Sequence, residues 1–172
     1  FIMSQIIISV GREFGSAGHE IAEELAKRFN LPIYDRHLIT EIANRTGMSA
    51  EQIAKHDEAP KTRILSRTVR GYSNSIEDNI AEMQFDFIRK KAESGESFVV
   101  VGRCAESKLR DFDCLCSLFI IGDMPCKIKR IMELYNMNES EAEDFIEKKD
   151  KKRKRYHNYH VKLHWGDSRL YD

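Results

Sequence analysis

The chain has 172 residues, enough for one domain with a single hydrophobic core. Its 28 basic and 28 acidic residues balance, so no excess positive charge favours nucleic acid or a membrane surface as a partner. No apolar run reaches the roughly 18 residues of a membrane-spanning helix, and the first residues lack the pattern of a signal peptide. We therefore expect one cytoplasmic domain that binds neither nucleic acid nor membranes.

Cysteine usage leads to the same expectation. The four cysteines, at positions 104, 114, 116 and 126, follow no spacing typical of disulfides or zinc sites. Cys114 and Cys116 alternate on a predicted strand, where we expect them to pack as reduced core residues.

Short apolar runs and helical repeats alternate along the chain. In the first third of the chain, the pattern predicts a strand at 5–10, a helix at 20–29, an extended segment at 31–34, and helices at 36–46 and 50–56. An irregular segment at 59–75 follows. The rest of the chain is predicted to form a helix at 76–94, strands at 98–101 and 115–121, and helices at 126–135 and 140–159. Strands that alternate with helices of this length predict an α/β fold with a parallel sheet and crossover helices. No further apolar run before Asp172 would complete the sheet.

Residues 11–19, the candidate phosphate loop, join the first predicted strand to the first predicted helix. In α/β folds such a junction binds phosphates, because unpaired helix N–H groups and the helix dipole converge there on an anion. Glycine at three positions permits positive φ angles and a close approach of the backbone to the anion. The alternative is a glycine-rich turn that serves packing alone. The candidate phosphate-binding residues are Gly11, Arg12, Gly15, Ser16, Ala17, Gly18 and His19.

The loop departs from the pattern G-x-x-x-x-G-K-[ST] in one important respect. Counted from Gly11, the lysine position holds Ala17, and counted back from Gly18 it holds His19. Arg12 and His19 are then the candidate cations, and Ser16 is the candidate Mg²⁺ ligand. The missing lysine also raises a second hypothesis, a nucleotide- or anion-binding regulatory protein that has lost catalysis.

Four stretches, at 6–25, 32–36, 98–103 and 118–130, together resemble the cytidylate kinase-like family of bacterial proteins in their order and spacing. The resemblance implies a P-loop kinase fold with three α/β/α layers and a parallel sheet of four to five strands, the last of which is absent here. It divides the single domain, residues 1–172, into a core, a helical NMP-binding insert and a charged helical lid. These correspond to residues 5–46 with 96–135, 47–95, and 139–165.

The resemblance also implies a reaction: Mg²⁺-dependent transfer of the ATP γ-phosphoryl group to CMP or a related small acceptor. Carried over to this chain, Asp35, Arg36 and Arg103 would bind the acceptor. The charge that develops in transfer would be met by Arg103, Arg130, Arg153 and Arg155, with Asp150 beside the two lid arginines. The family leaves open a different small acceptor.

Several of these charged residues have a plainer interpretation. Arg103 directly follows a buried strand, at the sheet edge where such folds bind ligands, but it could be a surface residue of a loop. Asp35 could simply cap the helix predicted at 36–46. The basic run at 148–155 could be a solvated helix face.

Three histidines near the end of the chain have helical spacing. His157, His160 and His164 could face one way, as ligands in a metal site do. No cysteine or carboxylate is placed near them in the sequence as a further ligand, so the pattern does not favour zinc.

Overall fold

The computed structural model describes residues 5–35, 47, 49, 51, 68–69, 72–73 and 76–172, and at 68–69 and 72–73 only the backbone. The helix predicted at 36–46 lies outside these residues, and so does the one at 50–56 apart from Glu51. The candidate acceptor residue Arg36 lies outside them too.

A parallel sheet forms the centre of the molecule. Its strands are β1 (Ile7–Arg12), β2 (Ile33–Tyr34), β5 (Phe98–Val101) and β6 (Leu115–Ile120), in the order β2-β5-β1-β6. Ile7 of the central strand β1 aligns with Phe98 on one side and with Leu115 on the other. The predicted α/β fold with a parallel sheet is thereby confirmed.

Strand β1 (Ile7–Arg12) begins and ends two residues later than the strand predicted at 5–10. Gly11 does not end it, because Gly11 and Arg12 continue the pairing with Phe119 and Ile120 of β6. The extension carries the strand directly into the candidate phosphate loop.

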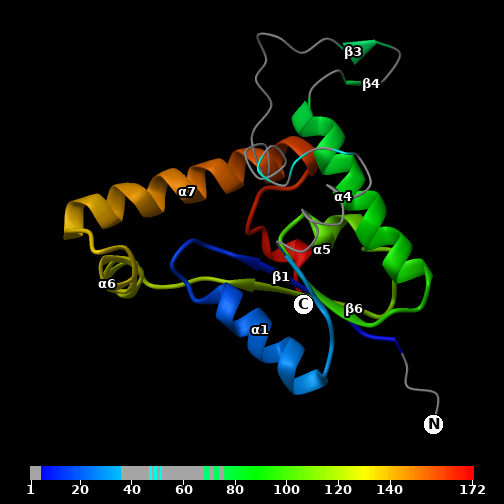
Figure 1. Ribbon diagram of the computed structural model, residues 1–172, viewed down its shortest axis with the longest axis horizontal. Coiled ribbons are helices and arrows are strands. Elements are labelled where there is room, and N and C mark those ends of the chain that lie inside the picture. Colours follow the sequence, from blue (N-terminus) through cyan, green and yellow to red (C-terminus); the bar gives the residue numbers. More distant parts are fainter. Residues whose placement is uncertain are drawn as a thin grey trace.

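Helices cover both faces of the sheet (Figure 1). One face packs on α1 (Gly18–Phe29), and the other on α4 (Ile76–Glu93) and the short α5 (Ala105–Lys108). The strands therefore bury alternate residues in two cores. Ile8 and Val10 contact the α1 side, whereas Ile7 and Phe98 contact the α4 side. Burial on both faces explains why these strands appear in the sequence as continuous apolar runs.

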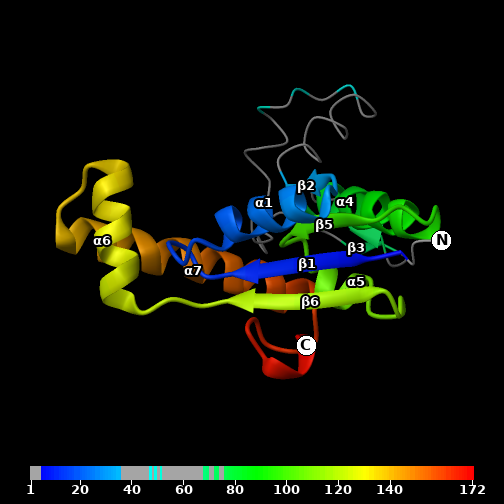
Figure 2. The ribbon, with the colours of Figure 1, turned by 90° about the horizontal axis from the view of Figure 1, so that it is seen from below.

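Two further helices lie beyond the carboxyl ends of β1 and β6 (Figure 2). They are α6 (Met124–Tyr135) and α7 (Glu139–His160), joined by a short connection. Asn138 caps α7 in a reciprocal capping box with Glu141. Among the described residues, no helix is both long enough and apolar enough to span a bilayer.

The segment predicted to be irregular contains regular structure. Within residues 59–75, β3 (Thr68–Val69) and β4 (Tyr72–Ser73) form an antiparallel pair, and the other residues of the segment lie outside the described part. Strands of two residues are too short to produce a detectable period in the sequence.

The end of the chain lies beside the edge strand β6. After the short helix η1 (Ser168–Leu170), the Asp172 N–H donates to the Ser117 carbonyl at 2.9 Å, and the Ser117 N–H donates to Asp172 Oδ2 at 2.8 Å. Asp172 thus forms hydrogen bonds with β6, although no apolar run in the sequence predicts a strand at this position.

The cysteines differ in part from their prediction. All four are free, as expected, but β6 begins at Leu115, so Cys114 precedes the strand. Both Cys114 and Cys116 are half-buried, while Cys104 is buried and Cys126 is exposed. Partial burial raises the pKa of the Cys116 thiol.

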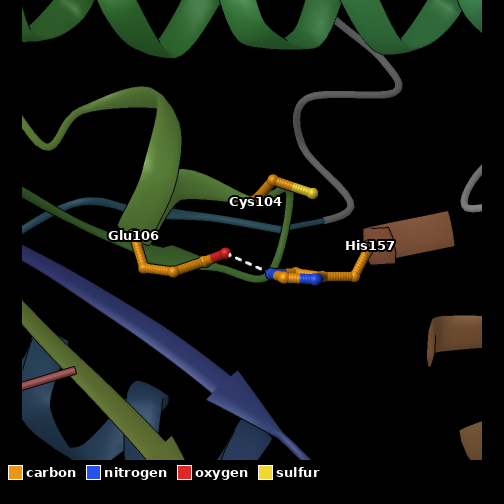
Figure 3. A group of neighbouring side chains, drawn as sticks. All are labelled: Cys104, Glu106 and His157. Atoms are coloured by element: carbon orange, nitrogen blue, oxygen red, sulfur yellow. Dashed lines mark hydrogen bonds and ion pairs between the residues drawn. The ribbon is translucent and has the colours of Figure 1, made fainter. Parts of the chain in front are cut away.

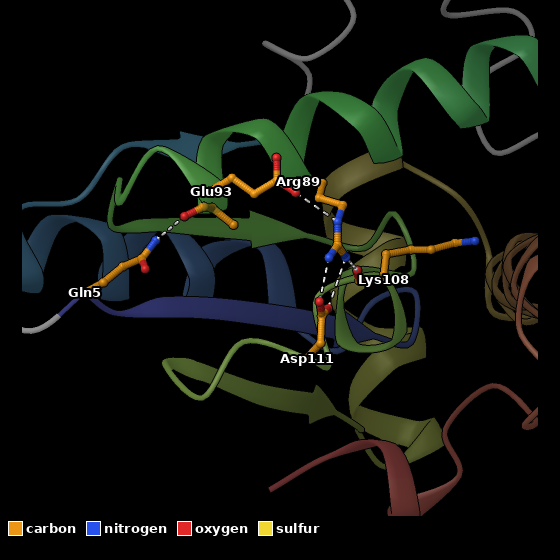
Figure 4. Close-up of polar contacts among 6 residues, drawn as sticks. Gln5, Arg89, Glu93, Lys108 and Asp111 are labelled. Carbon is orange, nitrogen blue, oxygen red and sulfur yellow. Dashed lines mark hydrogen bonds and ion pairs between the residues drawn. The ribbon is translucent and has the colours of Figure 1, made fainter.

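Polar contacts fix α4 in place (Figure 4). The Arg89 guanidinium donates to both carboxylate oxygens of Asp111, at 3.0 and 2.5 Å, and to the Lys108 carbonyl at 3.1 Å. About one turn further along α4, the Gln5 side chain donates to the Ala92 carbonyl at 2.8 Å. These contacts connect α4 to the segment after α5 and to the start of β1.

The apolar face of α4 should contribute strongly to stability. We expect Ile88→Ala to lower the free energy of unfolding by about 3 kcal/mol, because Ile88 is fully buried against the sheet. Ile76→Ala, at a position of the same helix that is 48% exposed, is the matched control and should change stability by less than about 0.5 kcal/mol. Urea denaturation measures both, and equal effects would contradict the packing described here.

Candidate functional site

A cavity of about 290 Å³ opens at the carboxyl edge of the sheet. The ends of β1, β2 and β5 meet there, as ligand sites of open α/β sheets do. The start of α1 and parts of α6 and α7 complete its wall. Its lining residues are Arg12, Glu13, Phe14, Gly15, Ala17, Gly18, His19, Glu20, Asp35, Val101, Arg103, Arg130, Ile131, Leu134, Tyr135 and Arg153.

The candidate phosphate loop has the backbone geometry of an anion cradle. Gly15 has φ of 81°, and Ala17, which precedes α1, has φ of 63° without a capping side-chain hydrogen bond. The loop thus turns sharply into the amino end of α1, where the first N–H groups have no partner within the helix. These donors and the helix dipole favour an anion at this end of the cavity.

Gly18 and Arg12 are in close contact across the loop. A Cβ atom at position 18 would lie 2.4 Å from Arg12 Cβ and 2.9 Å from Arg12 Cγ. Position 18 is therefore restricted to glycine by the Arg12 side chain, which lies across the turn and lines the cavity. The loop has no lysine, but it holds a guanidinium group beside the bend.

A buried lysine forms an ion pair with the candidate phosphate loop. The side chain of Lys127, on α6, is 5% exposed, and its Nζ donates to Glu13 Oε2 at 2.9 Å. The same Glu13 oxygen accepts the Gly122 N–H at 3.3 Å. Lys127 Nζ also lies 3.7 Å from Asp150 Oδ2 on α7. One ammonium group therefore joins the loop to both helices that follow β6.

Phe14 provides a second attachment of the loop. Its N–H donates to Asp150 Oδ1 at 2.6 Å, and its ring packs edge-on against Phe145 with the centroids 5.3 Å apart. The guanidinium of Arg153 lies over the Phe14 ring at 5.5 Å, and its Nη1 donates to the Arg12 carbonyl at 3.2 Å. Helix α7 thus contacts the loop through a carboxylate, a ring and a cation.

Arg103 reaches the cavity from a strained turn. Gly102, Arg103 and Cys104 have φ angles of 72°, 63° and 53°, so two non-glycine residues in succession are left-handed. Such conformations persist only where the surroundings fix them, and they cluster at functional sites. Arg103 is only 5% exposed, and its Nη2 lies 3.4 Å from the Asp35 carbonyl oxygen. The interpretation as a solvent-facing loop arginine is wrong.

Comparison with known proteins agrees with this geometry. Residues 7–172 match the cytidylate kinase-like family. The chain belongs to this family. No curated protein matched it.

Two solved structures are similar to the chain. A crystal structure of a protein from Eubacterium ventriosum is 42% identical, with a TM-score of 0.75, and the match covers 98% of this chain and 85% of that one. Shikimate kinase from Bacteroides thetaiotaomicron is 16% identical, with a TM-score of 0.52, and the match covers 90% of this chain and 82% of that one. The second likeness shows the P-loop kinase fold. Family and fold together support a nucleotide kinase-like protein.

Most of the site residues predicted from the sequence lie together in this family member. Arg130 forms an ion pair with Glu20 of α1, and His19 Nε2 lies 3.3 Å from Asp35 Oδ2. Their roles remain predictions. The predicted residues that line the cavity are Arg12, Gly15, Ala17, Gly18, His19, Asp35, Arg103, Arg130 and Arg153.

Three predicted residues are placed differently. Arg155 is exposed and does not line the cavity, because it lies two positions after Arg153 and so on another side of α7. Ser16 is absent from the cavity wall, and its hydroxyl donates to the Glu13 carbonyl at 2.8 Å. Gly11 lines a neighbouring small cavity instead, and its Cα faces Phe119, which a Cβ atom would approach to 2.7 Å.

The sequence did not reveal the residues that hold the loop. Glu13 and Lys127 are 114 positions apart and follow no motif. One signal was available: a lysine on the apolar face of an amphipathic helix, one turn before Ile131, needs a buried partner.

Removing the buried ammonium group should destabilise the protein. We expect Lys127→Met to lower the free energy of unfolding by about 3 kcal/mol, because Glu13 and Asp150 lose a partner in a largely dry site. Lys129→Met changes an exposed lysine of the same helix and is the control. Chemical denaturation compares them, and equal stability of the two variants would show that Lys127 does not anchor the loop.

Asp150 should make stability depend on pH. Burial raises the pKa of its carboxyl above the ordinary 3.8, although the Phe14 N–H and the charges of Lys127 and Arg153 act in the opposite direction. The folded state then binds this proton more tightly than the unfolded chain, so the contribution is present at low pH and is lost as pH rises through the folded pKa.

Asp150→Asn removes this titration. Relative to the variant, we expect the wild type to lose stability as the pH rises from about 4 to 7. Urea unfolding of both proteins across that range measures the difference, and a difference that is constant or grows with pH would contradict the raised pKa.

Proposed function

We propose that the protein transfers the γ-phosphoryl group of ATP to CMP or a related small acceptor that carries an anionic group. The observation that supports this most directly is the convergence of four arginines on one cavity beside a phosphate loop. They are Arg12, Arg103, Arg130 and Arg153, each from a different part of the fold. Phosphoryl transfer needs such cations, because negative charge spreads over the equatorial oxygens of the transferred group.

The phosphate loop would bind the ATP phosphates through its backbone. The positive φ of Gly15, the left-handed Ala17 and the close contact at Gly18 leave a narrow turn at the amino end of α1. A turn of this kind suits an oligophosphate better than a bulky neutral ligand, because its donors are backbone amides.

Arg12 would take the part that a lysine plays in other phosphate loops. Its side chain crosses position 18 and lines the cavity, while its carbonyl is held by Arg153. A guanidinium group stays protonated at every relevant pH and can bind two phosphate oxygens at once. The charge is thus supplied by the strand end rather than by the helix.

Arg103 would bind the anionic group of the acceptor. It is buried, it lines the cavity at the end of β5, and it lies close to the backbone of Asp35 at the end of β2. A nearly dry guanidinium group attracts an anion far more strongly than an exposed one does. The reaction would then proceed by positioning and charge stabilisation, without a covalent intermediate on the protein.

Mg²⁺ would enter with ATP and neutralise phosphate charge. Mg²⁺ prefers oxygen ligands and keeps several waters, so few protein ligands are required. Asp35 and Glu20 bring carboxylates to the cavity wall and fit this role, whereas the Ser16 hydroxyl already donates within its own loop.

A protein that binds nucleotide without catalysis is the second candidate. It is favoured by the absence of a loop lysine and by the Asp150 carboxylate, which accepts the Phe14 N–H of the loop at 2.6 Å. A carboxylate in that position competes with phosphate for a loop donor.

A coupled assay for ADP release, with a panel of nucleoside monophosphates, tests the proposal. We expect turnover with at least one pyrimidine monophosphate. Arg103→Ala should raise the acceptor KM and lower kcat, and Arg12→Ala should lower kcat, with kcat/KM falling about 100-fold in each, because each variant removes one preorganised cation. Arg110→Ala and Arg28→Ala change exposed arginines outside this cavity and should leave the kinetics unchanged.

Calorimetry with an ATP analogue and Mg²⁺ separates the two candidates. ATP binding without turnover on any monophosphate would favour the regulatory protein. Absence of ATP binding would overturn both. Unchanged kinetics of Arg103→Ala would remove Arg103 from the site.

A further inference from the structure

A second cluster of chemically active side chains lines a small cavity next to the large one. Cys104 and Glu106, from the segment after β5, meet His157 of α7 (Figure 3). All three are buried, with exposed fractions of 3%, 2% and 4%. His157 Nε2 lies 2.8 Å from Glu106 Oε1, and the ligand atoms of all three residues lie within 4.8 Å of one another.

This combination of groups is typical of a zinc site. Thiolate sulfur, imidazole nitrogen and carboxylate oxygen are the three zinc ligands found in proteins, and a site with three protein ligands completes its tetrahedron with water. At Zn²⁺ bond lengths of about 2.0–2.3 Å, ligand atoms lie roughly 3.3–3.8 Å apart. The longest spacing of up to 4.8 Å would have to contract by about 1.0–1.5 Å, and the His157–Glu106 pair at 2.8 Å would have to open by about 0.5 Å. Side-chain rotation can supply movements of this size.

The space for an ion and its water is present. A cavity of about 30 Å³ is lined by all three side chains, and the Tyr171 ring borders it. Roughly 10–15 Å³ suffices for one water molecule.

The charges of the three ligands are compatible with a divalent cation. A buried carboxylate is costly unless it is compensated, and Glu106 lies 2.8 Å from His157 in a small cavity that Arg12, Arg103 and Arg153 also line. Zn²⁺ with one thiolate, one carboxylate and a neutral imidazole is electrically neutral, so the complete site can stay buried. Cys104 is left-handed, with φ of 53°, and its sulfur lies on the side of His157 of α7 (Figure 3).

We propose that Cys104, Glu106 and His157 bind one Zn²⁺ ion that fastens α7 to the turn after β5. On binding, the Cys104 thiol releases its proton to solvent, and the proton that His157 Nε2 shares with Glu106 leaves this nitrogen, either for solvent or for Nδ1. Sγ, Nε2 and one Glu106 oxygen then each donate an electron pair to the metal. The small cavity shares Arg12, Arg103 and Arg153 with the large one, so the ion fixes the wall from which these arginines project. The proposal is independent of the kinase activity.

Cobalt substitution in the full chain tests the site. The protein is stripped with a chelator, dialysed and titrated with Co²⁺. We expect saturation at one equivalent, a thiolate-to-cobalt charge-transfer band, the intense visible bands of four-coordinate Co²⁺, and their loss when Zn²⁺ is added. The charge-transfer band should disappear in Cys104→Ser, and Co²⁺ affinity should fall by more than about 100-fold in Cys104→Ser and His157→Gln.

Matched controls exist on the same chain. Cys126→Ser and His164→Ala change an exposed cysteine and an exposed histidine, and both should keep the wild-type spectrum. Zn²⁺ should raise the Tm of the wild type and of both controls but not that of Cys104→Ser.

Either of two results would overturn the proposal. Absence of a thiolate band at stoichiometric Co²⁺, or a band that persists in Cys104→Ser, would leave Glu106 and His157 as a structural ion pair beside a buried thiol. If His157→Gln does not fold, the near-isosteric Cys104→Ser and the wild-type spectrum still decide the question.

Discussion

The contact on which the candidate site depends is the buried ion cluster of Lys127, Glu13 and Asp150 beside the candidate phosphate loop. A loop whose amides are to bind an anion has few of them left for its own stabilisation, so other contacts must fix its shape. Lys127 does so by holding Glu13 while remaining near Asp150, and Asp150 in turn accepts the Phe14 N–H. The cluster joins β1 to α6 and α7, so the loop and the arginines of both helices keep one arrangement.

Helix α7 contacts two different segments of the chain. Asp150 and Arg153 contact the candidate phosphate loop, and His157 contacts Glu106 in the segment after β5. The strained turn at Arg103 and Cys104 also contributes to both places, since Arg103 lines the large cavity and Cys104 belongs to the buried cluster with Glu106 and His157. Any ion or pair that ties Cys104 to His157 therefore also sets how far apart Arg103 and Arg153 lie.

Local patterns in the sequence were sufficient to predict most of the strands and helices. Apolar runs predicted β1, β5 and β6, and an extended segment was predicted where β2 lies. Helical spacing predicted α1, α4, α6 and α7, and the glycines at 15 and 18 marked the turn, because each of these signals arises from neighbouring residues. The edge of a parallel sheet then predicted where Asp35 and Arg103 would meet the loop. The two-residue strands β3 and β4 were missed, because so short a pairing leaves no period.

Only the tertiary structure decided which side chains face one another. Sequence spacing could not separate Arg153 from Arg155, since the choice depends on which side of α7 lies against Phe14. It also assigned His157 to a group with His160 and His164, whereas the chain places it with Cys104 and Glu106, about 50 residues earlier. The sequence by itself determined the α/β fold and the place of the glycine turn between β1 and α1, because strands, helices and glycine turns are local. The partners of Arg12, Lys127 and His157 come from distant segments, and only packing brings these together.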